Sequence, residues 1–354
     1  MKTGISLVGA GVLTAALGIF VWLRIPVPRP LSAIATRLDK INPTAKSWSD
    51  LPVEIFWAGA PVALRPQPYA WCSPSEILSL RGLNQGDFQL ERVNVFTGVT
   101  QPLRALDAFF ANHENRSERF GWDVSPDGQW FFGFADEPAG NYTLLTCRLD
   151  GSSARRSAFA ADDLVLSPDG NGWVELETRP DQILARRVSR ATRVTREIRL
   201  RSAHRLVAIG FAQVENCLVC WEVPTKPRPI SPVRCCRFDL GHPALRPGLF
   251  SVDVGPLACS LDQAQFSPRG DRIAWLFGFC NRETLLAYLK RRITGRPPVS
   301  YKMTAVWVCN ADGTALREVA RADANKSVSD LRWLPDGKHV SVIYRDSLWL
   351  VPVD

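Results

Sequence analysis

Short apolar runs of strand length recur along this chain, and each of the clearest ones follows a tight polar turn. The best example is "VSPDGQWFFGFAD" at 124–136, where a Ser-Pro-Asp-Gly turn leads into an almost continuous apolar segment. Pro126 presets φ at the second turn position, Asp127 suits the third, and Gly128 can adopt the left-handed conformation. A type I turn followed by a left-handed glycine is a common hairpin loop. The pattern therefore predicts strand, turn and strand.

The same turn returns three more times, at Pro168-Asp169-Gly170, Pro268-Arg269-Gly270 and Pro335-Asp336-Gly337. A strand-like apolar run follows each copy, and weaker copies occupy 71–80 and 209–223. Because each turn glycine is assigned a left-handed conformation, its replacement by valine is expected to cost about 1–2 kcal/mol, with a similar cost at each site. The glycines concerned are Gly128, Gly170, Gly270 and Gly337.

A second pair of strand-like runs follows each hairpin, for example at 143–158 and 305–320. The repeated unit is thus a four-stranded antiparallel sheet, and six units are anchored at positions 74, 126, 168, 214, 268 and 335. Four-stranded sheets that repeat at intervals of roughly 40–50 residues are typical of a β-propeller. Neighbouring blades cover the inner strands on both faces, which explains their continuous apolar runs. The pattern predicts an all-β fold, a six-bladed β-propeller over 51–354 with an insertion at 281–303.

The Ser-Pro-Asp-Gly hairpin followed by a strand and a second polar turn resembles the TolB-like, WD-like propeller repeat. The resemblance covers about residues 50–354; segments 124–158 and 266–320 match the repeat well, and 165–200 and 331–354 match it fairly. The resemblance implies the propeller architecture. It implies little about activity, because such propellers serve as binding modules, as gates on serine peptidases and, rarely, as enzymes.

The sixth unit ends after its third strand, at 347–354. Propellers avoid an open blade by borrowing a strand from the other end of the chain. The unassigned segment "LPVEIFWAGAPVALRP" at 51–66 lies upstream of the first unit. We therefore expect part of 53–64 to pair with 347–353 as the outer strand of the last blade.

The N-terminal segment 5–23 carries no charge and has the length of a membrane-spanning helix, about 20 residues. We interpret 1–24 as an uncleaved signal-anchor and 25–50 as a linker; a cleaved signal and a buried helix are the alternatives. The basic residues after the segment favour a cytoplasmic location for the rest of the chain. The very short stretch that precedes the segment is instead typical of exported proteins. We expect the propeller to be extracytoplasmic, in the periplasm or at the cell surface.

The formal net charge is +8, and basic residues are concentrated between 183 and 205. The first interpretation is that these charges protect the outer edge of the third blade from pairing with other chains. The second is an anion-facing patch toward lipid headgroups or an acidic partner. Nucleic acid is not expected as a partner, because aromatic residues are not interleaved with the basic ones. The patch would comprise Arg186, Arg187, Arg190, Arg193, Arg196 and Arg199.

Nucleophile, phosphate-binding and zinc motifs are missing from the sequence: it contains no G-x-S-x-G, no glycine-rich phosphate loop and no H-E-x-x-H. Cys217 and Cys220, with Cys235 and Cys236, lie inside predicted strands, where positions i and i+3 point to opposite faces. They are interpreted as core residues or, in an extracytoplasmic protein, as a cross-strand disulfide of blade four. We expect no cofactor and no metal.

These observations predict a membrane-anchored, non-catalytic propeller that binds a protein or other ligand at one mouth of its ring. A hydrolase or lyase with its active site at the channel mouth is the alternative, and a purely structural or assembly module is a third interpretation. Carboxylates or histidines converging at one face would favour the enzyme. Their absence would favour the binding protein.

Overall fold

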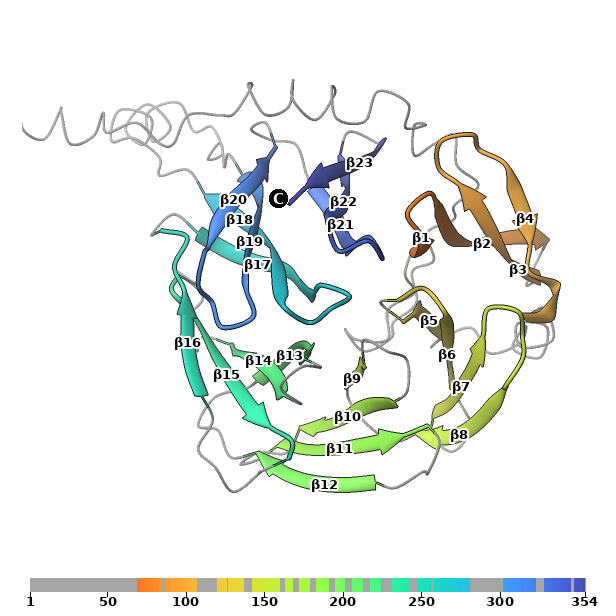
Figure 1. Cartoon of the computed structure of the whole chain (residues 1–354), viewed down its shortest axis with the longest axis horizontal. Helices are drawn as coiled ribbons and strands as arrows, with labels where there is room; N and C mark the ends of the chain where they lie inside the picture. Colours follow the sequence, from red (N-terminus) through yellow and green to blue (C-terminus); the bar gives the residue numbers. More distant parts are fainter. Residues whose placement is uncertain are drawn as a thin grey trace, which may run out of the picture.

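The fold was analysed in a computed structural model of the chain. It describes the residues 69–84, 87–106, 120–125, 127–136, 142–159, 163–167, 172–178, 183–190, 195–200, 206–212, 217–223, 231–241, 248–255, 258–280, 302–322, 328–344 and 347–353. The strands in these ranges form six antiparallel sheets, which follow one another around a ring (Figure 1). This arrangement is the six-bladed propeller that the repeat predicts.

The first three blades have four strands each, added in chain order from the centre of the ring outward. Blade one comprises β1 (Ala70–Ser73), β2 (Glu76–Asn84), β3 (Asp87–Asn94) and β4 (Thr100–Pro102), followed by the 3-10 turn η3 (Arg104–Leu106). Blade two comprises β5 (Phe120–Val124), β6 (Trp130–Asp136), β7 (Tyr142–Arg148) and β8 (Arg155–Phe159). Blade three comprises β9 (Asp163–Leu166), β10 (Gly172–Thr178), β11 (Ile183–Ser189) and β12 (Thr195–Leu200).

The last three blades repeat this order, and the described part of blade six has three strands. Blade four comprises β13 (Leu206–Ala212), β14 (Cys217–Glu222), β15 (Val233–Asp239) and β16 (Gly248–Val252). Blade five comprises β17 (Ala258–Phe266), β18 (Arg272–Cys280), β19 (Lys302–Asn310) and β20 (Arg317–Arg321). Blade six comprises β21 (Val328–Trp333), β22 (His339–Tyr344) and β23 (Ser347–Pro352).

The turn glycines have the left-handed conformation that the motif requires wherever the structure describes them. The φ angles are +74° at Gly128, +70° at Gly270 and +65° at Gly337. Each amide closes its turn on the carbonyl three residues earlier, as in the 2.7 Å hydrogen bond from Gly128 N to Ser125 O. The Ser125 hydroxyl also accepts a 2.9 Å hydrogen bond from Trp130 N, which fixes the start of the next strand. Pro126 and the turn 168–170 lie outside the described residues.

Two of these turns differ in what surrounds them. A Cβ atom built on Gly128 would lie 2.5 Å from the backbone oxygen of Cys72 in the neighbouring blade, closer than real Cβ atoms approach other atoms. A Cβ atom on Gly337 would meet nothing within 4 Å. Similar valine costs are therefore not expected at these two turns, because packing between blades adds to backbone strain at Gly128 and not at Gly337.

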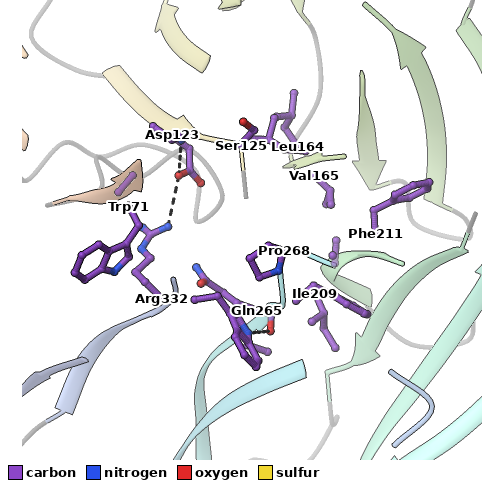
Figure 2. A pocket seen from close by; sticks show the side chains of 18 residues that line it. Trp71, Asp123, Ser125, Leu164, Val165, Ile209, Phe211, Gln265, Pro268 and Arg332 are labelled. Atoms are coloured by element: carbon purple, nitrogen blue, oxygen red, sulfur yellow. Dashed lines mark hydrogen bonds and ion pairs between the residues drawn. The ribbon is translucent and has the colours of Figure 1, made fainter. Parts of the chain in front are cut away.

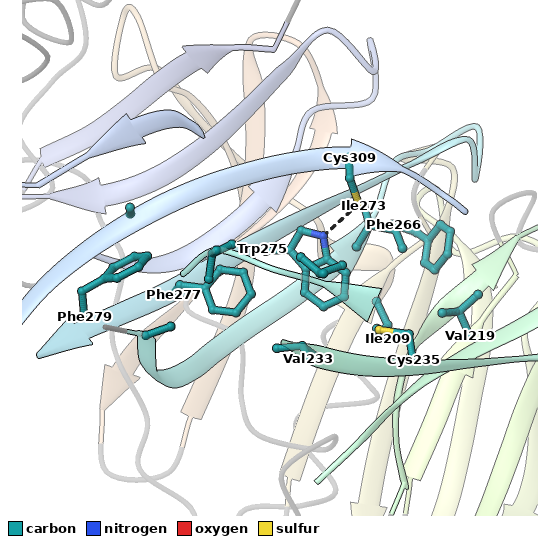
Figure 3. Close-up of a cluster of buried hydrophobic side chains, with 14 of the residues drawn as sticks. Ile209, Val219, Val233, Cys235, Phe266, Ile273, Trp275, Phe277, Phe279 and Cys309 are labelled. Carbon is teal, nitrogen blue, oxygen red and sulfur yellow. Dashed lines mark hydrogen bonds between the residues drawn. The ribbon is translucent and has the colours of Figure 1, made fainter. Parts of the chain in front are cut away.

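Apolar clusters join the blades, and each of the six boundaries has its own. The boundary between blades four and five is the richest, with Trp275 and Phe277 stacked at a centroid distance of 6.0 Å (Figure 3). Burying one such side chain stabilises the fold by about 1.5–3 kcal/mol. Pairs that represent the boundaries from blade one onward are Leu78 with Trp122, Phe132 with Trp173, Ile198 with Leu218, Val219 with Trp275, Leu276 with Val342, and Leu348 with Ile77.

The ring closes between blades six and one through buried side chains. The Trp71 indole donates a 2.7 Å hydrogen bond to Ser341 Oγ, and the Tyr69 hydroxyl donates one of 2.8 Å to the carbonyl of Asp330. Burial raises the pKa of the Tyr69 phenol, which keeps it protonated as a donor. The segment 51–66, expected to complete blade six, lies outside the described residues. The borrowed strand therefore stays a prediction.

The expected disulfide within blade four is wrong. Cys220 and Cys236 face each other across β14 and β15, yet the four cysteines of this blade are buried thiols. Burial raises the pKa of the Cys236 thiol to about 12, with the nearby Glu222 carboxylate adding to the effect. Their role is that of small core residues, as the first interpretation held. A disulfide does involve Cys259, in the first strand of blade five.

The predicted membrane anchor 1–24 and the linker 25–50 lie outside the described residues, as does the insertion 281–303 except for Lys302 and Met303. Among the residues that the structure does describe, none forms a helix long and apolar enough to cross a membrane.

Candidate functional site: the central cavity

A cavity of about 260 Å³ lies on the axis of the ring, lined by residues from the innermost strand of all six blades. Among the described strands, each of these pairs with a neighbour on one side only, and its other edge faces the channel. The lining residues are Ala70, Trp71, Asp123, Val124, Ser125, Leu164, Val165, Leu166, Ala208, Ile209, Gly210, Phe211, Ala264, Gln265, Phe266, Pro268, Arg332 and Trp333.

One repeat position supplies a lining residue from every blade. It is the third position before each unit's anchor, which is a proline in every unit except the fourth. Because each blade repeats the same strand and turn, this position is carried to the same place around the ring. Its occupants, in chain order, are Trp71, Asp123, Val165, Phe211, Gln265 and Arg332.

Asp123 and Arg332 are the only lining residues in the described set with ionisable side chains. They come from blades two and six and form an ion pair, with 3.6 Å between Asp123 Oδ1 and Arg332 Nη1 (Figure 2). Arg332 is buried, with 6% of its surface exposed. Asp123 Oδ1 also accepts a 2.8 Å hydrogen bond from the amide of Val124, so its orientation is fixed.

The Arg332 guanidinium has donors that no acceptor satisfies. Its Nε and Nη2 atoms are buried and have no hydrogen-bond partner within the part of the chain that the structure describes. Nε and Nη2 form one edge of the planar group, which is the fork that binds a carboxylate through two parallel hydrogen bonds. Buried donors are normally paired, so a group with two unmet ones needs an explanation.

Burial raises the pKa of the Asp123 carboxyl, and the opposing effect of the Arg332 charge is the smaller one. The carboxyl nevertheless lies against an open cavity, and its side chain is about a third exposed (34%). Keeping Asp123 ionised in the folded chain therefore costs free energy, and the charge of the Arg332 guanidinium offsets part of that cost.

The opposite side of the cavity is apolar. Figure 2 shows Val165, Ile209 and Phe211 across the cavity from Arg332, and the lining from this side includes Leu164. These residues belong to the inner strands of blades three and four. The cavity thus has a charged side and an apolar side, which suits an amphiphilic ligand.

The described arginines of the predicted anion-facing patch have different surroundings. Arg186 and Arg187 are neighbours on β11, which pairs on both sides and is not the outer edge of blade three. Arg186 forms ion pairs with carboxylates of the same blade, whereas the Arg187 guanidinium lies 5.8 Å from the ring centre of Phe211 in blade four.

The remaining patch residues are divided as well. Arg190 lies over Trp130 of blade two, 3.3 Å from the ring centre, and Arg199 is exposed on the outer strand β12 beside Glu197. The Arg196 side chain and Arg193 lie outside the described residues. An anion-facing role for the set stays a prediction.

Asp123 and Arg332 were not found from the sequence, although a signal for them exists. Both stand three residues before a turn proline, in "DVSP" and "RWLP". Superposing the six units would have shown that the same position holds an acid in one blade and a base in another. Within the described residues, no three histidine, cysteine or acidic side chains lie close enough together to hold a metal ion.

Comparison with known proteins gives no family model that matches the chain and no match among curated proteins. Solved structures give propeller neighbours. TolB from Acinetobacter baumannii is 12% identical with a TM-score of 0.43, and the match covers 81% of this chain and 63% of that one. A putative TolB from Agrobacterium tumefaciens is 13% identical with a TM-score of 0.43, covering 80% of this chain and 90% of that one.

An acylaminoacyl peptidase is also similar, at 9% identity and a TM-score of 0.46, covering 81% of this chain and 43% of that one. The chain is thus similar to TolB and to less than half of an acylaminoacyl peptidase. Such likeness concerns the fold alone, and it does not choose between binding and catalysis.

Proposed function

We propose that this chain is a non-catalytic propeller that binds a protein or other ligand at the mouth of its central channel. The cavity on the ring axis carries the proposal, because a buried arginine with unmet donors opposes an apolar wall there. Ligand sites are commonly apolar cavities with a few well-placed polar groups. The site is built from the inner strands of all six blades.

The alternative is a hydrolase or lyase at the same mouth. Acid and base chemistry of that kind normally uses two groups with separate roles. Asp123 is the only carboxylate among the described lining residues, and no histidine is found among them. A single carboxylate paired with an arginine supports binding better than it supports bond cleavage.

The channel is tested by filling it. Val165→Trp places a large side chain inside the cavity, and Leu249→Trp adds the same side chain on the outer strand of blade four, where Leu249 is 74% exposed. Proteins and small molecules that copurify from solubilised membranes are then compared by mass spectrometry. A ligand that is lost from Val165→Trp and retained by Leu249→Trp supports the proposal. Identical sets for both variants would overturn it, provided that Val165→Trp keeps the β signal in circular dichroism.

The proposal includes a membrane location, with segment 5–23 as an uncleaved anchor and the propeller outside the cytoplasm. The uncharged length of that segment supports this location. Deleting residues 1–24 should release a soluble protein with an unchanged β signal, and N-terminal sequencing of the native protein should find the anchor. A mature N-terminus near residue 30 would overturn the anchor. No nucleic acid takes part.

A further inference from the structure

We infer that the central cavity binds an amphiphilic monocarboxylate. Arg332 would hold the carboxylate, and the side lined by Val165 and Phe211 would contact the apolar part of the ligand. The inference rests on the proposed binding function and names the chemical class of its ligand. It comes from three features of the cavity: the unmet edge of one guanidinium, the position of the ion pair, and the apolar wall opposite.

The unmet edge selects a group with two coplanar acceptors. Nη1 of Arg332 faces Asp123, while Nε and Nη2 are buried without acceptors among the described residues. These two atoms donate in parallel from the same edge, and a carboxylate accepts from both at once. Because neither atom has accessible surface in this structure, the guanidinium must turn toward the cavity as the carboxylate binds. A neutral amide has one acceptor oxygen and would leave one donor unmet.

The ion pair limits the charge that the cavity accepts. Ionised Asp123 and Arg332 together carry no net charge, and no other ionisable side chain is found among the described lining residues. A monoanion adds one negative charge beside a guanidinium that can serve two carboxylates. A dianion such as phosphate would add a second negative charge next to Asp123 in a mostly apolar cavity, where charge is costly.

The apolar wall determines what accompanies the carboxylate. Val165, Ile209 and Phe211 lie across the cavity from Arg332 (Figure 2). An apolar group attached to the carboxylate would displace water from this wall and gain from its burial. The ligand is thus a small acid with an aliphatic or aromatic tail, or the C-terminal carboxylate of a peptide that ends in an apolar residue.

The experiment uses the full chain in detergent, titrated by calorimetry with phenylbutyrate, with its neutral amide phenylbutyramide and with inorganic phosphate. Phenylbutyrate should bind with one site per chain, the amide about tenfold more weakly or worse, and phosphate without measurable heat. Arg332→Gln should weaken phenylbutyrate binding by about tenfold to a hundredfold. Arg104→Gln removes the same charge at an exposed residue outside the cavity and should leave the affinity unchanged.

Two further titrations distinguish a free acid from the C-terminus of a peptide as the ligand. They use Gly-Gly-Phe with a free C-terminal carboxylate and the same peptide as its C-terminal amide. Preference for the free acid over phenylbutyrate assigns the site to peptide C-termini, and the reverse assigns it to free acids; both support the inference. Equal binding of acid and amide forms, or equal loss of affinity in Arg332→Gln and Arg104→Gln, would overturn it. If Val165→Trp still loses a natural ligand in that case, the proposed function stands and only the ligand class is wrong.

Discussion

Arg186 and Arg332 are both strand arginines beside carboxylates, but the ring surrounds them differently. Arg186, with 26% of its side chain exposed, lies 2.5 Å from a Glu177 oxygen, and oxygens of Glu197 and Glu175 lie within 4.0 Å. Arg332 is more deeply buried and has one carboxylate, at 3.6 Å. Two of its nitrogens remain without acceptors among the described residues.

The difference separates a structural charge from a binding charge. Three carboxylates over-satisfy Arg186, so its charge holds the inner and outer strands of blade three together. Arg332 is under-satisfied in a cavity, and the fold alone gives no reason to keep it there. Proteins retain such locally unfavourable groups mainly at functional sites.

Arg186→Met tests the comparison directly, because it removes the common partner of three carboxylates. The free energy of unfolding should fall by about 2–3 kcal/mol at pH 7.5 in urea denaturation, because Glu175 and Glu177, with side chains 12% and 30% exposed, lose their counter-charge. Arg199→Met is the control, since Arg199 is 71% exposed and should cost less than about 0.5 kcal/mol. Equal losses of unfolding free energy in the two variants would contradict a structural role for the Arg186 charge.

The Arg186→Met penalty should also depend on pH. Burial raises the pKa of Glu175, and Arg186 is one of the groups that lower it, so removing Arg186 raises this pKa further. The variant therefore keeps its stability while Glu175 is protonated and loses it as pH rises through the raised pKa. At pH 5 the difference from wild type should be smaller than at pH 7.5.

The comparison of Arg186 with Arg332 assumes that the neighbours of a residue in the folded ring, and not its local sequence motif, determine how much stability a substitution loses. Gly128 and Gly337 test this without charges, because both occupy the left-handed position of the same turn. Gly337→Val should cost about 1–2 kcal/mol from strain alone, and Gly128→Val about 2 kcal/mol more because of the Cys72 backbone. Equal melting temperatures for the two variants would show that the turn motif dominates.

A change of opposite sign is expected at the channel. The double variant Arg332→Met with Asp123→Asn replaces an under-satisfied ion pair, and its free energy of unfolding should rise by about 1 kcal/mol in the absence of ligand. The same variant should lose phenylbutyrate binding. Stabilisation together with lost binding is typical of a binding-site residue. A clear loss of stability would assign Arg332 a structural role like that of Arg186.

The smallest effect is expected from Asp123→Asn alone, and it should appear in the pH dependence. Arg332 is the charged group that acts on Asp123 from the described residues, and burial outweighs it. With its pKa raised in the folded chain, Asp123 contributes stability below its ordinary pKa and loses it as pH rises through the raised value. The variant should lose less stability than wild type between pH 4 and pH 7, as followed by melting temperature. Parallel curves would mean that Asp123 titrates normally.

Much of this fold could be predicted because its information is local. The turns at Gly128, Gly270 and Gly337 depend on residues adjacent in the sequence, and each apolar run that follows has the length of a strand. Repetition then supplies the blade count, since one blade cannot bury its own faces. The thiols of Cys220 and Cys236 show the limit: their facing positions follow from strand pairing, but their redox state does not.

The sequence by itself determined the repeating blade, the number of blades and the left-handed turn glycines, because neighbouring residues set these through backbone sterics and hydrophobic pattern. Only the tertiary structure decided the site. Asp123 and Arg332 come from the second and sixth blades, and ring closure through Tyr69 and Trp71 brings their strands to one axis. The missing acceptors of Arg332 are a property of the assembled cavity, since burial and hydrogen-bond satisfaction depend on groups far apart in the chain.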